Sequence, residues 1–448
     1  MEHFWNRALE FQDIFLRMYP EYIPPPIYHD DGTPKVRLAT RSVTIVVTEQ
    51  CNLRCYYCYQ HNKNNTRMTK ERAREIVDLL FEEDAKNNQF INEVDARALI
   101  LDFIGGEPLL EIELIDYFMH YFRQRALELN HRWAIHHIIS ISTNGILYNT
   151  SKVKEFIEKN RGRLSITITI DGNKELHDSC RRFPDGSPSY DIVEQSMFEH
   201  LKVDPYAATK LTLAPANVMH AYKALRHLFE GIGLPTIFAN CVYEEGWTNE
   251  HAAILYEQLK QFADWILENN IEIDHYCSIF DPTLGTPMSP LDNNNWCGGT
   301  GSMISFTPDG YAQPCLRYTH FNLNDKQPEI RMGDVETGIA NTEEYKNTLK
   351  SLDAITRRSQ STDECFNCPI AQGCSWCSAY NYEVTGTPNK RVTFICPMHK
   401  ARVMANRYFW KKLYAKHRIN RDFPLTIPKE WALEIISEEE YDILLRLP

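Results

Sequence analysis

The chain has 448 residues, of which 43% are hydrophobic and 12% aromatic. These values predict a globular protein of two or three domains with a sizeable core. The formal net charge of −12 disfavours a nucleic-acid partner, and no apolar run is long enough to make a membrane span, so we expect neither kind of partner.

The first 41 residues are predicted to form an N-terminal extension that is too short to be a domain. A helical pattern at residues 5–18 precedes a proline-rich extended piece at residues 23–27, and we expect this segment to pack outside the main domain or to help bind a partner. The N-terminus lacks the regions of a signal peptide, which predicts a cytoplasmic protein. Thiols stay reduced in the cytoplasm, so the 13 cysteines are expected to be metal ligands or core residues.

Three cysteines follow a β-branched run at residues 42–48, and they are Cys51, Cys55 and Cys58. Three thiolates in one short loop can hold an iron–sulfur cluster, and because four ligands are usual, one iron would stay open for chemistry. A zinc knuckle would need a second pair of ligands, for which His61 is the only nearby candidate. A disulfide would need an oxidising compartment. The spacing therefore favours a cluster.

Residues 42–245 alternate between strand-like and helical patterns. The strand-like runs lie at residues 42–48, 98–104, 135–141, 164–170, 210–214 and 236–242. The helical patterns lie at residues 69–84, 112–129, 151–159, 192–201 and 220–230. This alternation predicts an α/β fold with a partial (β/α)6 barrel, whose site lies at the C-terminal ends of the strands.

Two polar motifs stand at the ends of the second and third predicted strands. The first contains Gly105, Gly106 and Glu107, and its glycines would let the backbone approach a ligand closely. The second contains Ser142 and Asn144, whose short polar side chains suit ribose and carboxylate oxygens. The same side chains could also cap a helix.

A third polar motif follows the fourth predicted strand. Thr169 and Asp171 stand at the strand end, and Arg181 and Arg182 follow downstream. The fork of an arginine can grip a carboxylate, and the sequence leaves open which of the two arginines does so.

A second cysteine system lies at residues 297–400, after a helical bridge at residues 246–296 that includes a helix at 256–268. Its members are Cys297, Cys315, Cys365, Cys368, Cys374, Cys377 and Cys396. A Thr-Pro-Asp-Gly turn at residues 307–310 predicts a hairpin. Zinc sites are an alternative, but seven cysteines exceed the needs of one. The remaining cysteines, Cys180, Cys241 and Cys277, are predicted to be core residues.

The C-terminal tail, residues 401–448, is predicted to be helical. A cationic helical pattern at residues 399–417 carries Lys400, Arg402, Arg407, Lys411 and Lys412, and an acidic helical pattern follows from residue 428. We expect these charges to form a solvated face, with a leader-peptide or partner surface as the alternative.

The first cysteine triplet, with Tyr57 before its third member and the Gly-Gly motif after the second strand, resembles the radical S-adenosylmethionine (SAM) superfamily. The resemblance implies one [4Fe–4S] cluster on Cys51, Cys55 and Cys58, with SAM on its open iron. It implies a SAM-binding set made of Tyr57, Gly105, Gly106, Glu107, Ser142, Asn144, Thr169, Asp171, Arg181 and Arg182.

The second cysteine system resembles the SPASM domain, a C-terminal iron–sulfur extension of radical SAM maturases, although that family usually has three residues between the cysteines numbered here 374 and 377. The resemblance implies two auxiliary [4Fe–4S] clusters and thus three in all. The distal cluster would use Cys365, Cys368, Cys374 and Cys396. The proximal cluster would use Cys297, Cys315 and Cys377, with either Cys277 or a substrate thiolate as the fourth ligand.

The resemblance implies a peptide maturase that cleaves SAM to a 5′-deoxyadenosyl radical and crosslinks a ribosomally made peptide, most plausibly through a thioether. Its partners would be the precursor peptide and a low-potential electron donor of the flavodoxin or ferredoxin type. A sulfatase maturase that forms formylglycine is an alternative, although it would carry an Asp where this chain has Leu316. A carbon–carbon crosslinking enzyme and a zinc-bound binding module also stay open. No base is assigned, and the candidates are Asp309, Tyr318 and His320.

Overall fold

The computed structural model describes residues 17–18, 20, 40–82, 98–244, 246–295, 297–324, 326–374, 376–421 and 423–447. The helix expected at residues 5–18 and the proline-rich piece at 23–27 lie almost wholly outside the described residues. The chain divides into two compact units, and each is treated by itself. The first comprises Met1–Asn52, Cys58–Thr167 and Gly298–Ala354, and the second comprises Leu53–Tyr57, Ile168–Cys297 and Ile355–Pro448.

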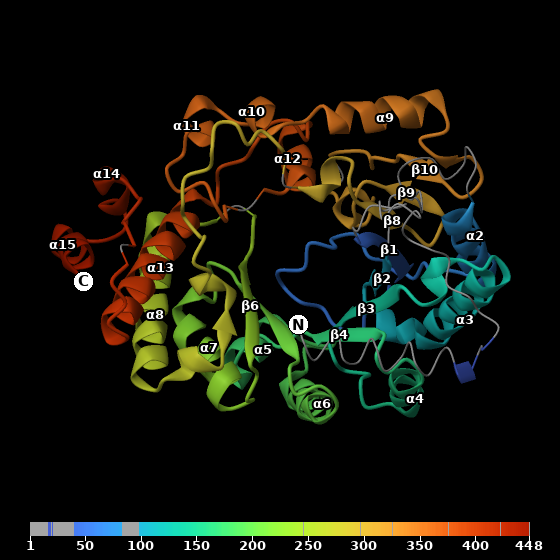
Figure 1. The fold of residues 1–448 in the computed structure, drawn as a ribbon, viewed down its shortest axis with the longest axis horizontal. Coiled ribbons are helices and arrows are strands. Elements are labelled where there is room, and N and C mark those ends of the chain that lie inside the picture. The colour runs from blue at the N-terminus through green and yellow to red at the C-terminus, as the bar shows by residue number, and fades with distance from the viewer. Residues whose placement is uncertain are drawn as a thin grey trace. The chain divides into compact units, whose positions relative to one another are not determined.

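The first unit is built on a sheet with the strand order β11-β10-β9-β8-β1-β2-β3-β4. Its strands are β1 (Thr40–Thr48), β2 (Ala98–Gly105), β3 (His137–Thr143), β4 (Leu164–Ile168), β8 (Ile304–Phe306), β9 (Tyr311–Gln313), β10 (Gly333–Asp334) and β11 (Gly338–Ile339). Its helices are α2 (Lys70–Phe81), α3 (Ile112–Glu128), α4 (Ser151–Lys159) and α9 (Glu343–Asp353). Figure 1 shows α2 and α3 lying together beside these strands.

Strand β1 lies inside this sheet and is buried from Val43 to Thr48. It pairs in parallel with β2 on one side and with β8 on the other, where Val43 is opposite Ile304. Val43 and Ile45 are fully buried, as expected for a parallel strand that is covered on both faces. The pairing of β8 with β1 joins a segment far along the chain to the strand that precedes the first cysteines.

Local signals set the helix boundaries of the first unit. The side chain of Thr69 accepts a hydrogen bond from the backbone of Arg72 at 3.1 Å and caps α2. Helices α2 and α3 pack through Phe81 and Phe122, whose ring centroids lie 5.1 Å apart. The hairpin β8–β9 turns at residues 307–310, as the sequence predicts.

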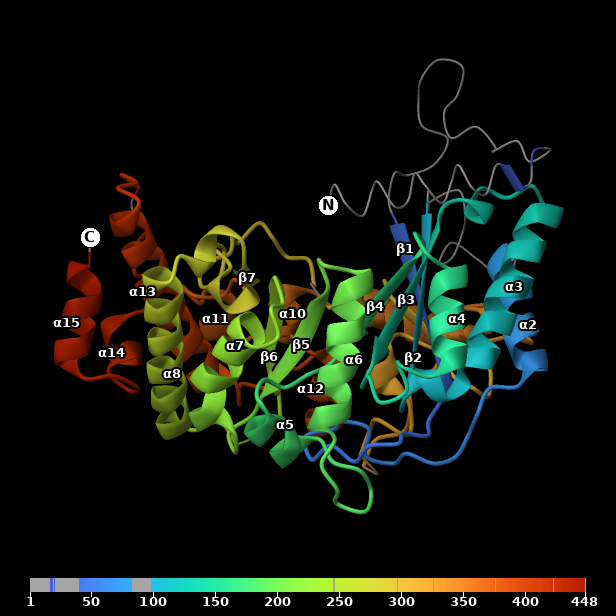
Figure 2. The same ribbon diagram turned by 90° about the horizontal axis from the view of Figure 1, so that it is seen from below.

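The second unit contains a smaller parallel sheet, ordered β5-β6-β7. Its strands are β5 (Ala208–Leu213), β6 (Thr236–Cys241) and β7 (Tyr276–Cys277). Its helices are α5 (Lys174–Cys180), α6 (Tyr190–Val203), α7 (Ala221–Glu230), α8 (Asn249–Glu268), α10 (Arg357–Gln360), α11 (Asp363–Phe366), α12 (Ser378–Thr385), α13 (Cys396–Lys416), α14 (Lys429–Ala432) and α15 (Glu438–Arg446). Helices α8 and α13 run side by side (Figures 1 and 2).

The prediction that the charges of the cationic helix form a solvated face is wrong for two of them. Arg407 is 1% exposed and stacks on Phe423, with its guanidinium carbon 4.4 Å from the ring centroid. Lys411 is 9% exposed and donates to the backbone oxygens of three residues at the end of α15, namely Leu444, Leu445 and Leu447. A cation at a helix C-terminus satisfies carbonyls that have no partner inside the helix. These residues therefore stabilise the fold.

Among the described residues, no helix combines the length and the hydropathy that a membrane crossing requires.

Candidate active site and cysteine-lined pocket

The cysteines separate by burial as their predicted roles require. Cys180, Cys241 and Cys277, predicted as core residues, are buried, whereas all ten predicted ligands are partly exposed. Burial raises the pKa of Cys241 to about 11 and that of Cys277 to about 12. The three buried thiols are enclosed in the core, whereas the other ten are partly exposed and so remain accessible to a bound group.

Gly105 and Gly106 lie against the chain that leads into the first cysteine loop. A Cβ atom on Gly105 would stand 2.2 Å from the backbone oxygen of Thr48, and one on Gly106 would stand 2.3 Å from that of Gln50. The Gly106 amide donates to the Thr48 carbonyl at 2.9 Å. The close approach that these glycines permit is thus to the protein's own backbone, immediately before Cys51.

Glu107 is 1% exposed, and its carboxylate is fully engaged at the end of β3. It accepts from the Thr143 hydroxyl at 2.6 Å and from the backbone amides of Leu109 and Asn144 at 3.0 and 2.8 Å. Such a buried carboxylate needs several donors, and here they come from β3 and from its own short helix. The geometry gives its side chain a positioning role.

Asn144 lies beside the first cysteine. Its side-chain amide donates to Asn52 Oδ1 at 2.7 Å and reaches Cys51 Sγ at 3.9 Å. Its own oxygen accepts from the backbone of Ile146 at 3.1 Å, which fixes the orientation of the amide. Ser142, two residues earlier in β3, is half-buried.

In the second unit, Tyr57, Asp171 and Arg181 form one hydrogen-bonded cluster, in which Asp171 and Arg181 are buried and Tyr57 is partly exposed. The Tyr57 hydroxyl donates to Asp171, and Arg181 donates to the same hydroxyl at 2.8 Å. Asp171 also accepts from the backbone of Thr212 at 3.0 Å. Burial raises the pKa of Asp171, and the charge of Arg181 opposes that shift. Thr169 is half-buried just beyond β4.

The two candidate arginines have different surroundings. Arg181 is 8% exposed, and its Nε has no hydrogen-bond partner within the described part of the chain. Arg182 is exposed and donates to the carbonyl of Gly186 at 3.0 Å, within a turn. A buried donor without a partner is costly unless a ligand fills it, so Arg181 is the better candidate for an anionic ligand.

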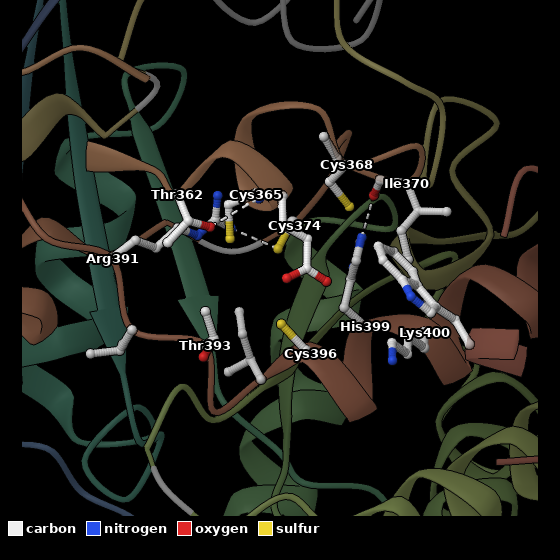
Figure 3. Close-up of a pocket in the computed structure, with 15 residues that line it drawn as sticks. Thr362, Cys365, Cys368, Ile370, Cys374, Arg391, Thr393, Cys396, His399 and Lys400 are labelled. Atoms are coloured by element: carbon white, nitrogen blue, oxygen red, sulfur yellow. Dashed lines mark hydrogen bonds between the residues drawn. The ribbon is translucent and has the colours of Figure 1, made fainter. Parts of the chain in front are cut away.

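Four of the predicted ligands line one cavity of about 370 Å³ in the second unit, and they are Cys365, Cys368, Cys374 and Cys396. In Figure 3 the sulfurs of Cys365, Cys374 and Cys396 point toward the same space. Burial, together with the nearby Cys374 and Cys365, raises the pKa of Cys396 to about 12, so a bound metal would have to displace its proton.

The four cysteines are a suitable donor set for an iron–sulfur cluster. They share a cavity of about 370 Å³, and four thiolates are the usual ligands of such a cluster. Four thiolates also suit a tetrahedral zinc site, so the identity of the metal is left to metal analysis.

The other three cysteines of the second system, Cys297, Cys315 and Cys377, lie apart in the sequence. Cys297 and Cys377 belong to the second unit, where the Cys377 sulfur accepts from the backbone of Tyr380 at 3.4 Å and caps α12. Cys315 belongs to the first unit and follows the β8–β9 hairpin.

The segment after Cys315 carries the candidate bases. Leu316 is buried with Val46 and Phe321, so no carboxylate stands next to the cysteine. His320 Nε2 lies 3.4 Å from Glu49 Oε1, and its Nδ1 lies 3.8 Å from Glu329 Oε2. These two carboxylates raise the pKa of His320 to about 10.

His320 is therefore protonated at neutral pH, which makes it a poor proton acceptor there. The other two candidates are less well placed, since Tyr318 is fully buried and Asp309 is exposed at the hairpin turn. The sequence did not single out Glu49, which is fully buried against His320. The sequence signal that could have pointed to Glu49 is its position directly after β1 and two residues before Cys51.

The strand, the cysteine triplet and the polar strand ends all lie in one stretch that matches a known family. Residues 45–195 match the radical SAM superfamily. The chain carries a radical SAM domain. A Methanocaldococcus jannaschii protein described as uncharacterized is 33% identical over 152 residues, which are 33% of this chain and 44% of that protein. A cysteine-type anaerobic sulfatase-maturating enzyme from Clostridium perfringens is 25% identical over 336 residues, which are 71% of this chain and 83% of that enzyme.

Solved structures resemble this chain over most of its length. Native anSMEcpe with bound AdoMet and the Cp18Cys peptide has a TM-score of 0.58 at 19% identity and covers 85% of this chain and 100% of its own. Streptococcus suis SuiB bound to the precursor peptide SuiA has a TM-score of 0.51 at 12% identity and covers 81% of this chain and 76% of its own. These likenesses confirm the predicted α/β radical SAM fold, and the C-terminal cysteines are consistent with a SPASM domain.

Proposed function

We propose that this chain is a radical SAM peptide maturase that installs a thioether in a cysteine-containing, ribosomally made peptide. The observation that carries the proposal is the pairing of a cysteine triplet inside a radical SAM domain with a second set of seven cysteines, four of them around one cavity. The proposed domains are the barrel at residues 42–245, a bridge at 246–296 and a SPASM domain at 297–400, between an extension at 1–41 and a tail at 401–448.

Three [4Fe–4S] clusters and SAM are the proposed cofactors. When bound, the first cluster and SAM would supply a 5′-deoxyadenosyl radical able to take a hydrogen atom from the substrate. Around this group Asn144 would hold the Cys51 loop, and Glu107 would hold the end of β3 that carries Asn144. Arg181 would bind the SAM carboxylate through its fork, with Asp171 and Tyr57 orienting it.

A peptide substrate is supported by the solved neighbours. SuiB was solved bound to the precursor peptide SuiA, and anSMEcpe with a peptide named Cp18Cys. The formation of a thioether removes a hydrogen atom from the carbon, and a proton and an electron from the thiol. The reaction therefore needs a proton acceptor. We propose Glu49 and Glu329 for this role, because they lie 3.4 and 3.8 Å from His320 in the segment that follows Cys315. A flavodoxin or ferredoxin would supply the electron for SAM cleavage.

Sulfatase maturation to formylglycine is the second candidate, favoured by the 25% identity to a sulfatase-maturating enzyme across 71% of this chain. The burial of Leu316 in an apolar cluster counts against it, because that position would carry the catalytic Asp. Carbon–carbon crosslinking is a further variant of the same radical chemistry. Metal analysis of anaerobically purified protein tests the common basis: iron and sulfide support all three reactions, whereas zinc alone would support the binding-module alternative.

We predict that Cys315→Ser loses crosslinking but still cleaves SAM, whereas Cys277→Ser keeps both. Cys277 is 5% exposed in β7, where a serine hydroxyl costs stability without removing a ligand, while Cys315 is proposed to hold an iron that also binds the substrate thiolate. Mass spectrometry of a cysteine-containing peptide should show the loss of two hydrogens and resistance to thiol alkylation. If Cys277→Ser destroys a cluster, direct substrate ligation must be abandoned. A hydrazide-reactive aldehyde in the product would instead establish the formylglycine reaction.

We predict that Arg181→Gln weakens SAM binding by about 10-fold or more, since a charge-assisted hydrogen bond is worth roughly 1.5–3 kcal/mol. Arg182→Gln is the matched control and should leave the affinity unchanged, because its guanidinium serves an exposed turn. Equilibrium binding of SAM to the reconstituted proteins provides the measurement, with iron content as the check on folding. If the Gln variant is unstable, the SAM affinity of Arg181→Lys, which keeps the charge beside Asp171, tests the assignment instead. Equal affinities in the Arg181 and Arg182 variants would refute the assignment.

A further inference from the structure

Arg391 makes a direct contact with one sulfur of the cysteine-lined cavity. Its Nη2 donates to Cys374 Sγ at 2.8 Å, and its guanidinium carbon lies 3.6 Å from the centroid of the Trp376 ring. The backbone of Arg391 is also fixed, because its amide donates to the carbonyl of Gln360 at 3.0 Å. A guanidinium stacked on an aromatic face and aimed at a thiolate is a fixed charge.

Other charged groups of both signs lie on the cavity wall or act on its cysteines. Lys400 lies on the wall but is paired with Glu434 at 2.6 Å. Burial lowers the pKa of His399 to about 3, so its imidazole is neutral. Arg402 on α13 acts on Cys374 through its positive charge, and its Nε has no hydrogen-bond partner within the described residues. Glu364 is the carboxylate on the cavity wall.

We propose that Arg391 raises the reduction potential of the cluster held by Cys365, Cys368, Cys374 and Cys396. Reduction adds one electron to the cluster and its thiolates, and a cation bonded to one of those thiolates stabilises the more negative, reduced form. Arg402 adds to the same effect without a direct bond. The cluster is therefore poised to accept an electron, for example one released when the substrate is oxidised. This inference rests on the proposed function, because it needs a cluster in the cavity.

The experiment is a redox titration followed by electron paramagnetic resonance on the full chain with Cys51, Cys55 and Cys58 replaced by alanine. With the radical-site cluster removed, two auxiliary clusters remain, each accepting one electron. Arg391→Gln keeps a hydrogen-bond donor and loses the charge, and we expect one of the two midpoint potentials to fall while the other stays. Arg391→Lys keeps the charge and loses the planar stack on Trp376, so the same potential should fall by less.

Arg358→Gln is the matched control, since Arg358 is half-exposed and pairs with Asp363 at 2.6 Å on the neighbouring α11. It should leave both potentials unchanged. Two unshifted potentials in the Arg391→Gln protein, with iron content preserved, would overturn the inference and leave the proposed function standing. If the Gln variant loses the cluster, the Lys variant decides, and an unshifted potential there overturns the inference as well. A parent protein without reducible iron would refute the proposed function instead.

Discussion

Replacing Cys51, Cys55 and Cys58 together by alanine is expected to abolish SAM cleavage and to leave about eight irons in place of about twelve, on the basis of three four-iron clusters. The loss is confined to one cluster because the seven other predicted ligands lie elsewhere in the chain, four of them around a cavity of their own. Iron and sulfide analysis after anaerobic reconstitution, together with an assay for 5′-deoxyadenosine, measures both effects.

The chain offers a matched control for this triple replacement. Cys180, Cys241 and Cys277 are buried and were predicted to be core residues, with Cys277 also left open as a fourth ligand of the proximal cluster. If the substrate thiolate is that fourth ligand, as proposed, their replacement by alanine should keep all the iron and all the SAM cleavage. It should cost some stability, since each change leaves a small cavity in the core. Production of 5′-deoxyadenosine by the Cys51/Cys55/Cys58 variant would refute the assignment of these cysteines to the radical-generating site.

Gly106→Val is the second change with a large expected effect, and its effect should reach the first cluster. A Cβ atom on Gly106 would meet the backbone oxygens of Gln50 and Glu49 at 2.3 and 2.5 Å, and neither is a flexible side chain that could move aside. The segment that leads into Cys51 must therefore shift. We expect about four of about twelve irons to be lost, and SAM cleavage with them.

Gly233→Val provides the comparison for this change. Gly233 has a φ of +79° with nothing within 4 Å of an added Cβ, so valine there is strained but displaces no neighbour. That variant should lose stability and keep its iron. If Gly106→Val keeps all its iron and loses only SAM affinity, then the glycine serves the ligand and the loop tolerates the displacement.

Much of the barrel could be predicted because its signals are local. The helix expected at residues 151–159 is observed with those bounds, and the one expected at residues 69–84 is observed as Lys70–Phe81. The division of the cysteines also followed from sequence, since clustered cysteines proved accessible and the three outside the clusters proved buried. The predicted roles of the individual ligands and SAM contacts stay predictions.

The features that the sequence did not reveal depend on residues distant in the chain. Lys411 was expected to be a solvated charge, but in the fold it donates hydrogen bonds to the backbone carbonyls at the end of α15. Arg181 and Arg182 are adjacent and chemically identical, and only the fold places one of them against Asp171. Glu49 and His320 meet because β8 pairs with β1, a non-local contact that no local pattern encodes.

That pairing has a consequence for how the protein is made. While a ribosome synthesises the chain from its N-terminus, β1 can pair with β2 early, but its other edge waits for Ile304, about 260 residues after Val43. At roughly 5–20 residues per second, the wait lasts on the order of tens of seconds. Throughout it the nascent chain presents an apolar strand edge beside the first cysteine loop, a template for wrong pairing between chains. Correct folding around the first cysteine loop, the proposed radical site, therefore depends on the late synthesis of the β8–β9 hairpin, and a stalled or truncated chain would leave that strand edge unpaired.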